Sequence, residues 1–168
     1  MYQILTYVED NFVKSAICSS ELKNGEVVLV EGLADSTLAK IGNIGVDGEC
    51  YKVGDLKDDA NRILAMVASD GHRYEKETSY NFGDYADTPA GEPVRVYFLH
   101  KGMVVSIEKS LIDGTVAVGD QLTVKADSHN LKKYTAPTST EAGAKRIVGE
   151  VIGTSKLMGK DMVQILFY

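Results

Sequence analysis

The sequence predicts an all-β protein: a small β-barrel or sandwich with an extended N-terminal arm and a long irregular central loop. Short apolar runs of strand length recur along the chain, and turn residues separate them, above all in the second half. The composition, with 16 Gly and 9 Tyr against 3 Pro and no Trp, suits strands joined by many turns. No segment shows a sustained helical period.

The size and charge of the chain set the class of protein. With 168 residues, 44% of them hydrophobic, it can bury the core of one domain. We expect residues 1–24 to form the arm and the first strand or strands, and residues 25–168 the barrel or sandwich, with a loop inserted around 71–91. The net charge of −6 disfavours direct binding of nucleic acid, which depends on Lys and Arg contacts to phosphates.

Location and redox state can also be anticipated. No apolar run reaches the length of a membrane span, so we expect no membrane association. The first residues lack the basic and apolar regions of a targeting peptide, which favours synthesis in the cytoplasm with reduced cysteines. Spacing leaves open whether Cys18 and Cys50 are two thiols or form one disulfide.

In the first half, each expected strand is indicated by its own local pattern. "YQILTYV", residues 2–8, is loosely strand-like. Asn24-Gly25 is a strong hairpin turn signal, and the apolar run at residues 27–30 after it predicts a strand covered on both faces. "NRILAMVAS", residues 61–69, fits helix or strand by composition, and its short length favours a strand.

The second half is more regular. Lys101-Gly102 predicts the turn of a hairpin between strands within residues 92–100 and 103–110. "KLMGKD" joins the last two expected strands of the chain. Six strand candidates spaced by turns favour a barrel or sandwich. They lie within residues 92–100, 103–110, 112–128, 130–137, 145–155 and 160–168.

Asp120, in "TVAVGDQLTV", is the first candidate for a functional carboxylate. A catalytic or metal-binding carboxylate needs a partner group, and the local sequence supplies none. Gly119 tolerates a positive φ, and Asp120 can bond to the backbone two residues further on. Leu122 and Val124 then face one way. We therefore predict that Asp120 shapes a turn and that its loss costs modest stability.

Other candidates for chemistry are equally isolated. His72, His100 and His129 are far apart and lack metal-ligand spacing. The acidic residues within 55–59 lack the spacing of a calcium-binding loop, so a solvated segment is the favoured interpretation. Neither cysteine lies in a nucleophile signature. We predict no catalytic residue, no metal ligand and no cofactor, and hence a protein that is not an enzyme.

Aromatic and apolar side chains in two segments are candidates for contact with a partner. Tyrosine is favoured at protein interfaces because it buries much area at a low cost in entropy. The alternatives are an ordinary first strand for the arm and a loop that packs on its own core. The candidates are Tyr2, Ile4, Tyr7 and Phe12 in the arm, and Tyr74, Tyr80, Phe82 and Tyr85 in the loop.

A family resemblance rests on "AGEPVRVYFLHKGMVVSIEKSLIDGTVAVGDQLTVKADSHNLKKYT", then "KRIVGEVIGTS" and the closing "MVQILFY". The order of a hairpin, Val-Gly-Asp, a strand, a short Asn-Leu segment, Val-Gly-Glu-Val and a terminal apolar strand resembles the capsid decoration, or cement, proteins of tailed bacteriophages. The earlier segment "AICSSELKNGEVVLVEG" resembles the start of such proteins. Residues 33–91 have no counterpart in this pattern.

The resemblance implies a structural virion protein on the outer surface of an assembled capsid. It would bind the major capsid protein, stabilise contacts between capsid subunits, and self-associate, commonly as a homotrimer. Two alternatives remain open at this point. One is another phage virion β-protein, such as a tail tube or head-completion component. The other, less favoured, is a small β-barrel ligand-binding module or enzyme.

Overall fold

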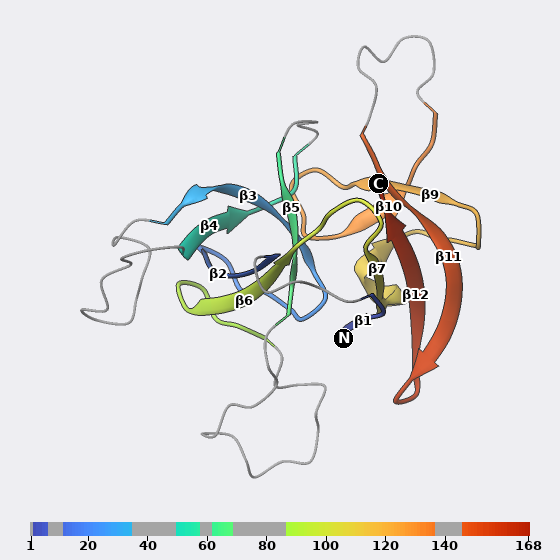
Figure 1. Ribbon diagram of the computed structural model, residues 1–168, viewed down its shortest axis with the longest axis horizontal. Coiled ribbons are helices and arrows are strands. Elements are labelled where there is room, and N and C mark those ends of the chain that lie inside the picture. The colour runs from blue at the N-terminus through green and yellow to red at the C-terminus, as the bar shows by residue number, and fades with distance from the viewer. Residues whose placement is uncertain (1, 7–11, 35–49, 58–61, 69–86, 137–145) are drawn as a thin grey trace.

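A computed structural model describes residues 2–6, 12–34, 50–57, 62–68, 87–136 and 146–168 (Figure 1). In these residues the chain is almost entirely β, which confirms the predicted all-β class. A short 3-10 helix, η3 (Lys109–Leu111), follows β7. The strands are β1 (Tyr2–Ile4), β2 (Val13–Cys18), β3 (Val27–Leu33), β4 (Cys50–Gly54), β5 (Leu64–Val67), β6 (Pro93–Phe98), β7 (Val104–Glu108), β8 (Ile112–Asp113), β9 (Gln121–Val124), β10 (Leu131–Lys133), β11 (Ile147–Leu157) and β12 (Lys160–Phe167).

The strands form two sheets. One is a closed barrel with the order β2-β4-β3-β5-β6, and the other is a seven-stranded sheet with the order β1-β7-β12-β11-β9-β10-β8. Most pairings are antiparallel, but β2 runs parallel to β4 and β10 runs parallel to β8. In Figure 1 the barrel lies on the left, the seven-stranded sheet on the right, and β5 between them.

Strand β3 is buried on both faces, as the apolar run predicted. Val27 and Leu29 pack into the cluster shared with the seven-stranded sheet, whereas Val28 and Val30 pack inside the barrel. Successive side chains of a strand point to opposite faces, so four consecutive apolar residues can cover both. Val27, Val28 and Leu29 are at most 1% exposed, which confirms the prediction for this run.

Strand β5 repeats the arrangement next to β3. Leu64 and Met66 face the seven-stranded sheet, and Ala65 and Val67 face the barrel interior. All four side chains are buried. The strand interpretation of residues 61–69 is therefore confirmed for Leu64–Val67.

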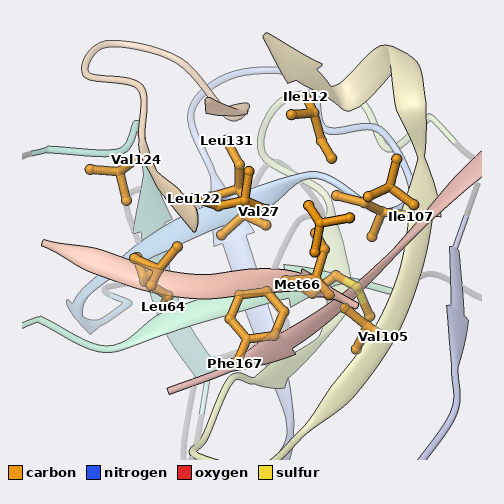
Figure 2. Close-up of a cluster of buried hydrophobic side chains, with 14 of the residues drawn as sticks. Val27, Leu64, Met66, Val105, Ile107, Ile112, Leu122, Val124, Leu131 and Phe167 are labelled. Atoms are coloured by element: carbon orange, nitrogen blue, oxygen red, sulfur yellow. The ribbon is translucent and has the colours of Figure 1, made fainter. Parts of the chain in front are cut away.

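A continuous apolar core joins the two sheets, and we call the contact between them the seam (Figure 2). On the barrel side it is built from β3 and β5, and on the sheet side from β7, β8, β9, β10, β11 and β12. Burial of apolar surface is the main favourable term in folding, at roughly 25 cal/mol per Å². Figure 2 shows Val27, Leu64 and Met66 facing Val105, Ile107, Ile112, Leu122, Val124, Leu131 and Phe167.

Backbone hydrogen bonds fasten the loop between β9 and β10 across the seam. The amide of Val27 donates to the carbonyl of His129 at 3.0 Å. The amide of Leu56 donates to the carbonyl of Ser128 at 2.9 Å, and the amide of Asp127 donates back to Leu56 at 2.9 Å. This loop of the seven-stranded sheet is therefore held against the ends of β3 and β4 in the barrel.

The last two strands, which the sequence predicted to be joined by "KLMGKD", pair as a hairpin. Its turn is Met158-Gly159, with φ of 50° and 82°, the conformation of a two-residue type I′ turn. Near its other end, a Cβ at Gly149 would lie 2.5 Å from the carbonyl oxygen of Leu166. The glycine of "VGEV" thus permits close approach of two backbones.

The prediction that the strands on either side of Lys101-Gly102 form a hairpin is wrong. The turn exists, with the amide of Met103 donating to His100 at 3.1 Å and a φ of 85° at Gly102. However, β6 pairs with β2 and β5, and β7 pairs with β1 and β12. The chain passes here from the barrel, which contains β6, to the seven-stranded sheet, which contains β7. The turn reverses the direction of the backbone but does not determine which strands pair.

The hairpin signal at Asn24-Gly25 fails for the same reason. Gly25 has a φ of 90°, and the amide of Glu26 donates to Lys23 at 3.1 Å, so the turn is real. The flanking strands β2 and β3 are not neighbours, since β4 lies between them. Closing the barrel requires β2 to pair with β4 and β6, which overrides the local turn.

Residues before position 25 contribute to both sheets. Strand β1 pairs antiparallel with β7, with Tyr2 opposite Ile107 and Ile4 opposite Val105. Strand β2 belongs to the barrel. The division of the chain at residue 24 stays a prediction, and residues 71–86 of the predicted loop lie outside the described residues.

The shared core can be tested at Leu29, which is 1% exposed and packs at the seam. We expect Leu29→Ala to lower the free energy of unfolding by roughly 2–5 kcal/mol, because it removes buried methyl groups and leaves a cavity. Urea denaturation followed by circular dichroism measures the change. Leu33→Ala is the matched control, since Leu33 is on the same strand but 67% exposed. Equal effects of the two changes would contradict the seam.

Candidate functional site at the seam

Four polar side chains from distant parts of the chain meet at the seam, and we call them the seam cluster. Cys18 ends β2, Glu26 precedes β3, Asp55 follows β4, and His129 lies in the loop between β9 and β10. The imidazole Nδ1 of His129 is 3.3 Å from Oε2 of Glu26, and its Nε2 is 3.1 Å from Oδ1 of Asp55. The side chain of His129 is 11% exposed.

The topology explains why these residues meet. The parallel pairing of β2 with β4 sets Cys18 opposite Val53, two residues before Asp55. The turn before β3 places Glu26, whose carboxylate also accepts a hydrogen bond from the amide of Lys23 at 2.8 Å. The loop held at the ends of β3 and β4 then brings His129 between them.

The surroundings of His129 favour its charged form. Hydrogen bonds with Cys18 and Glu26 outweigh burial and raise the pKa of His129 to about 10. Burial alone would raise the pKa of the Cys18 thiol, but its hydrogen bonds with His129 and Ser20 prevail and lower that pKa. The cluster therefore favours the charged imidazolium of His129 and shifts the thiol of Cys18 toward its thiolate form.

The two carboxylates contribute unequally. Glu26 is 12% exposed at the side chain, so water screens its attraction to His129 only weakly. The side chain of Asp55 is 54% exposed. Its Oδ1 is 3.1 Å from Nε2 of His129, but it does not lie along the N–H direction that a hydrogen bond requires. Nε2 is buried and makes no hydrogen bond of good geometry to a described residue. Glu26 is thus the stronger carboxylate partner of His129.

A thiolate beside an imidazolium is the chemistry of a nucleophilic cysteine. Here, however, Cys18 is 3% exposed, and its sulfur lies 3.1 Å from the hydroxyl oxygen of Ser20. A substrate would reach the sulfur only after neighbouring side chains moved. The arrangement is suited to holding charges across the seam.

The described part of the chain offers few other sites. It contains no group of three or more His, Cys, Asp or Glu side chains arranged to hold a metal ion. Within the same residues, no helix has the length and apolar character needed to cross a membrane. Cys18 and Cys50 are both free thiols, which answers the question that their spacing left open.

The predicted partner-contact residues are only partly described. Tyr2 and Ile4 lie on β1 and pack, half-buried, against the shared core. The ring of Phe12 is 4.4 Å from the ring of His100, near the passage from barrel to sheet. Their role in binding a partner stays a prediction. Tyr7, Tyr74, Tyr80, Phe82 and Tyr85 lie outside the described residues, as do His72 and residues 58–59 of the acidic segment.

Asp120 is confirmed as a turn residue, but the direction of its bond was predicted wrongly. Its Oδ2 accepts a hydrogen bond from the amide of Ala117 at 2.9 Å, three residues back, and not from an amide two residues further on. Its Oδ1 is 2.8 Å from Nζ of Lys133. Gly119 has a φ of 89°, and Leu122 and Val124 both enter the shared core, as predicted.

Comparisons with protein-family models, with curated proteins and with solved structures each find no match.

The pH dependence of stability tests the charged pair. The raised pKa of His129 gives stability that is complete below pH 6.5 and lost as the pH rises through about 10. The lowered pKa of Cys18 gives stability that is complete above 9.0 and lost as the pH falls through its folded value. The two effects offset only where both groups titrate, and between 9.0 and about 10 only the loss from His129 remains.

Cys18→Ala removes both the offset and the largest cause of the raised pKa of His129. We therefore expect the loss of stability to move from the range between 9.0 and about 10 toward lower pH. Urea midpoints measured from pH 6 to 10.5 for wild type and variant check this. Cys50→Ala is the control, because Cys50 lies outside the seam cluster. Parallel pH profiles for wild type and Cys18→Ala would rule out the coupling.

A second pH test concerns the turn at Asp120. Its hydrogen bonds with Lys133 and Ala117 lower the pKa of Asp120 below 3.8. The stability it contributes is present above 3.8 and lost as the pH falls through the lowered value. We expect Asp120→Ala to reduce the urea midpoint slightly at pH 7 and by less at pH 2. An equal reduction at both pH values would show that the carboxylate is not the cause.

Proposed function

We propose that the protein is a structural virion protein that binds the outer surface of an assembled phage capsid and stabilises contacts between major capsid subunits. One observation supports this most directly. The later segments that carry the family resemblance cover β6–β12, which supply every strand of the seven-stranded sheet except β1, and the earlier segment covers parts of β2 and β3. The resemblance therefore covers nearly all of the seven-stranded sheet and part of the barrel.

The joined sheets suit a clamp between subunits. Because β3 and β5 are covered on both faces, motion of one sheet against the other would expose buried apolar side chains. A rigid body loses little conformational freedom when it binds, so more of its contact energy remains as affinity. Such a protein needs no catalytic group.

The surface also suits many modest contacts. Large apolar side chains are exposed at separate places, including Leu33 at 67%, Val118 at 63% and Met158 at 71%. A homotrimer would present three copies of each place to a repeating shell and gain avidity from them together. The net charge of −6 favours protein partners over the packaged nucleic acid.

Reconstitution tests the proposal. Purified protein is added to capsids assembled without it, and we expect saturable binding and a higher temperature of capsid disruption, measured by light scattering. Capsids already carrying the protein are the control and should bind no more. Absence of binding together with unchanged capsid stability would overturn the proposal, and ring-shaped assemblies in electron micrographs would favour a tail or head-completion component.

A further inference from the structure

The hairpin of β11 and β12 extends beyond the strand that flanks β11. Strand β11 pairs with β12 as far as Leu157, but it pairs with β9 only from Ile147 to Glu150. Val151 is still held, because its carbonyl accepts from Gly119 and its amide donates to Asp120. From Gly153 to Leu157, no described residue pairs with the outer edge of β11. Figure 1 shows this part of the hairpin projecting from the sheet.

The register shows which backbone groups this edge offers. In an antiparallel pair, successive residues direct their N–H and C=O groups alternately toward and away from the partner strand. Phe167 exchanges backbone hydrogen bonds with Gly102 and Met103, just before β7, so Val163, four residues earlier, also directs its groups to β7. Thr154 lies opposite Val163 and therefore directs its groups away from β12. Lys156, two residues further on, does the same. The edge thus presents the N–H and C=O of Thr154 and Lys156.

An open edge of this kind accepts an added strand. Five residues span about 17 Å of strand. An edge this short would bury far less accessible surface than the roughly 1,000 Å² that a stable interface between two copies needs. It suits instead a segment whose protein makes further contacts elsewhere, as a subunit of a decorated shell would.

We propose that the edge of β11 from Gly153 to Leu157 binds an extended segment of the shell protein by strand addition. This inference rests on the proposed function and specifies the contact surface for it. The edge runs along one side of the projecting hairpin, so a segment can reach it without displacing any described strand (Figure 1).

The side chains along the edge indicate the chemistry of that segment. Lys156 is 77% exposed, and its pair with Asp161 at 3.7 Å is also open to water. Such a surface pair contributes little, so Lys156 can exchange it for a carboxylate of the bound segment. Met158, at the tip, is 71% exposed. We therefore expect an acidic residue in the segment, with an apolar residue toward the tip.

Proline at Thr154 tests the backbone contact. Thr154→Pro removes an outward N–H and leaves the bonds between β11 and β12 in place, as edge strands tolerate. We expect it to bind capsids assembled without the protein about tenfold more weakly, from loss of one or two hydrogen bonds. Thr154→Val, which keeps the N–H, is the matched control and should bind like wild type. Circular dichroism verifies that both variants are folded.

Charge reversal tests the segment's chemistry independently of proline. We expect Lys156→Glu to weaken binding at low salt, with a smaller effect at high salt. Lys125→Glu, an equal charge change at a residue 41% exposed and distant in sequence, is the control. If Thr154→Pro and Lys156→Glu both bind like wild type, the edge is not the contact, although the proposed function stands. If wild type itself does not bind, the proposed function is overturned and this inference with it.

Discussion

The structure depends on one constraint: β3 and β5 carry apolar side chains on both faces, so both faces must be covered. The barrel interior covers one face with Val28, Ala65 and Val67. The other face, with Leu29 and Met66, requires the seven-stranded sheet. Neither sheet would bury its apolar residues alone. The passage of the chain after β6, the docked loop and the position of the polar cluster are all consequences of joining the two sheets at this seam.

The polar cluster beside the apolar core has a role that burial alone would not supply. An apolar contact is not directional, and it tolerates sliding of one sheet on the other. His129 must meet Glu26 and Cys18 together, which fixes one position of the loop on the barrel. A buried charge that loses its partners is costly, so other positions are disfavoured. The cluster thereby adds specificity to a contact whose free energy comes mainly from the core.

The positions of individual strands could be predicted from the sequence, because they depend on local patterns of residues. Alternation and apolar runs identified Val27–Val30, the second-half strands and the segment that joins the last two of them. The pairing of the strands could not be predicted, because the turns at Asn24-Gly25 and Lys101-Gly102 reverse the chain without determining which strands pair. The seam cluster was missed since Cys18 and His129 are far apart in sequence and meet only through the parallel pairing of β2 and β4. The open edge of β11 could not be predicted either, because it depends on where β9 ends.

The central claim is that the two sheets form one unit through the seam. Native-state hydrogen exchange in low urea tests it most directly, by comparing amides of β5 in the barrel with amides of β9 in the other sheet. We predict that the most protected amides of both strands exchange with the same free energy of opening and the same dependence on urea. If the amides of one strand lost protection at lower urea while the other sheet remained protected, the sheets would be independent and the account would be contradicted.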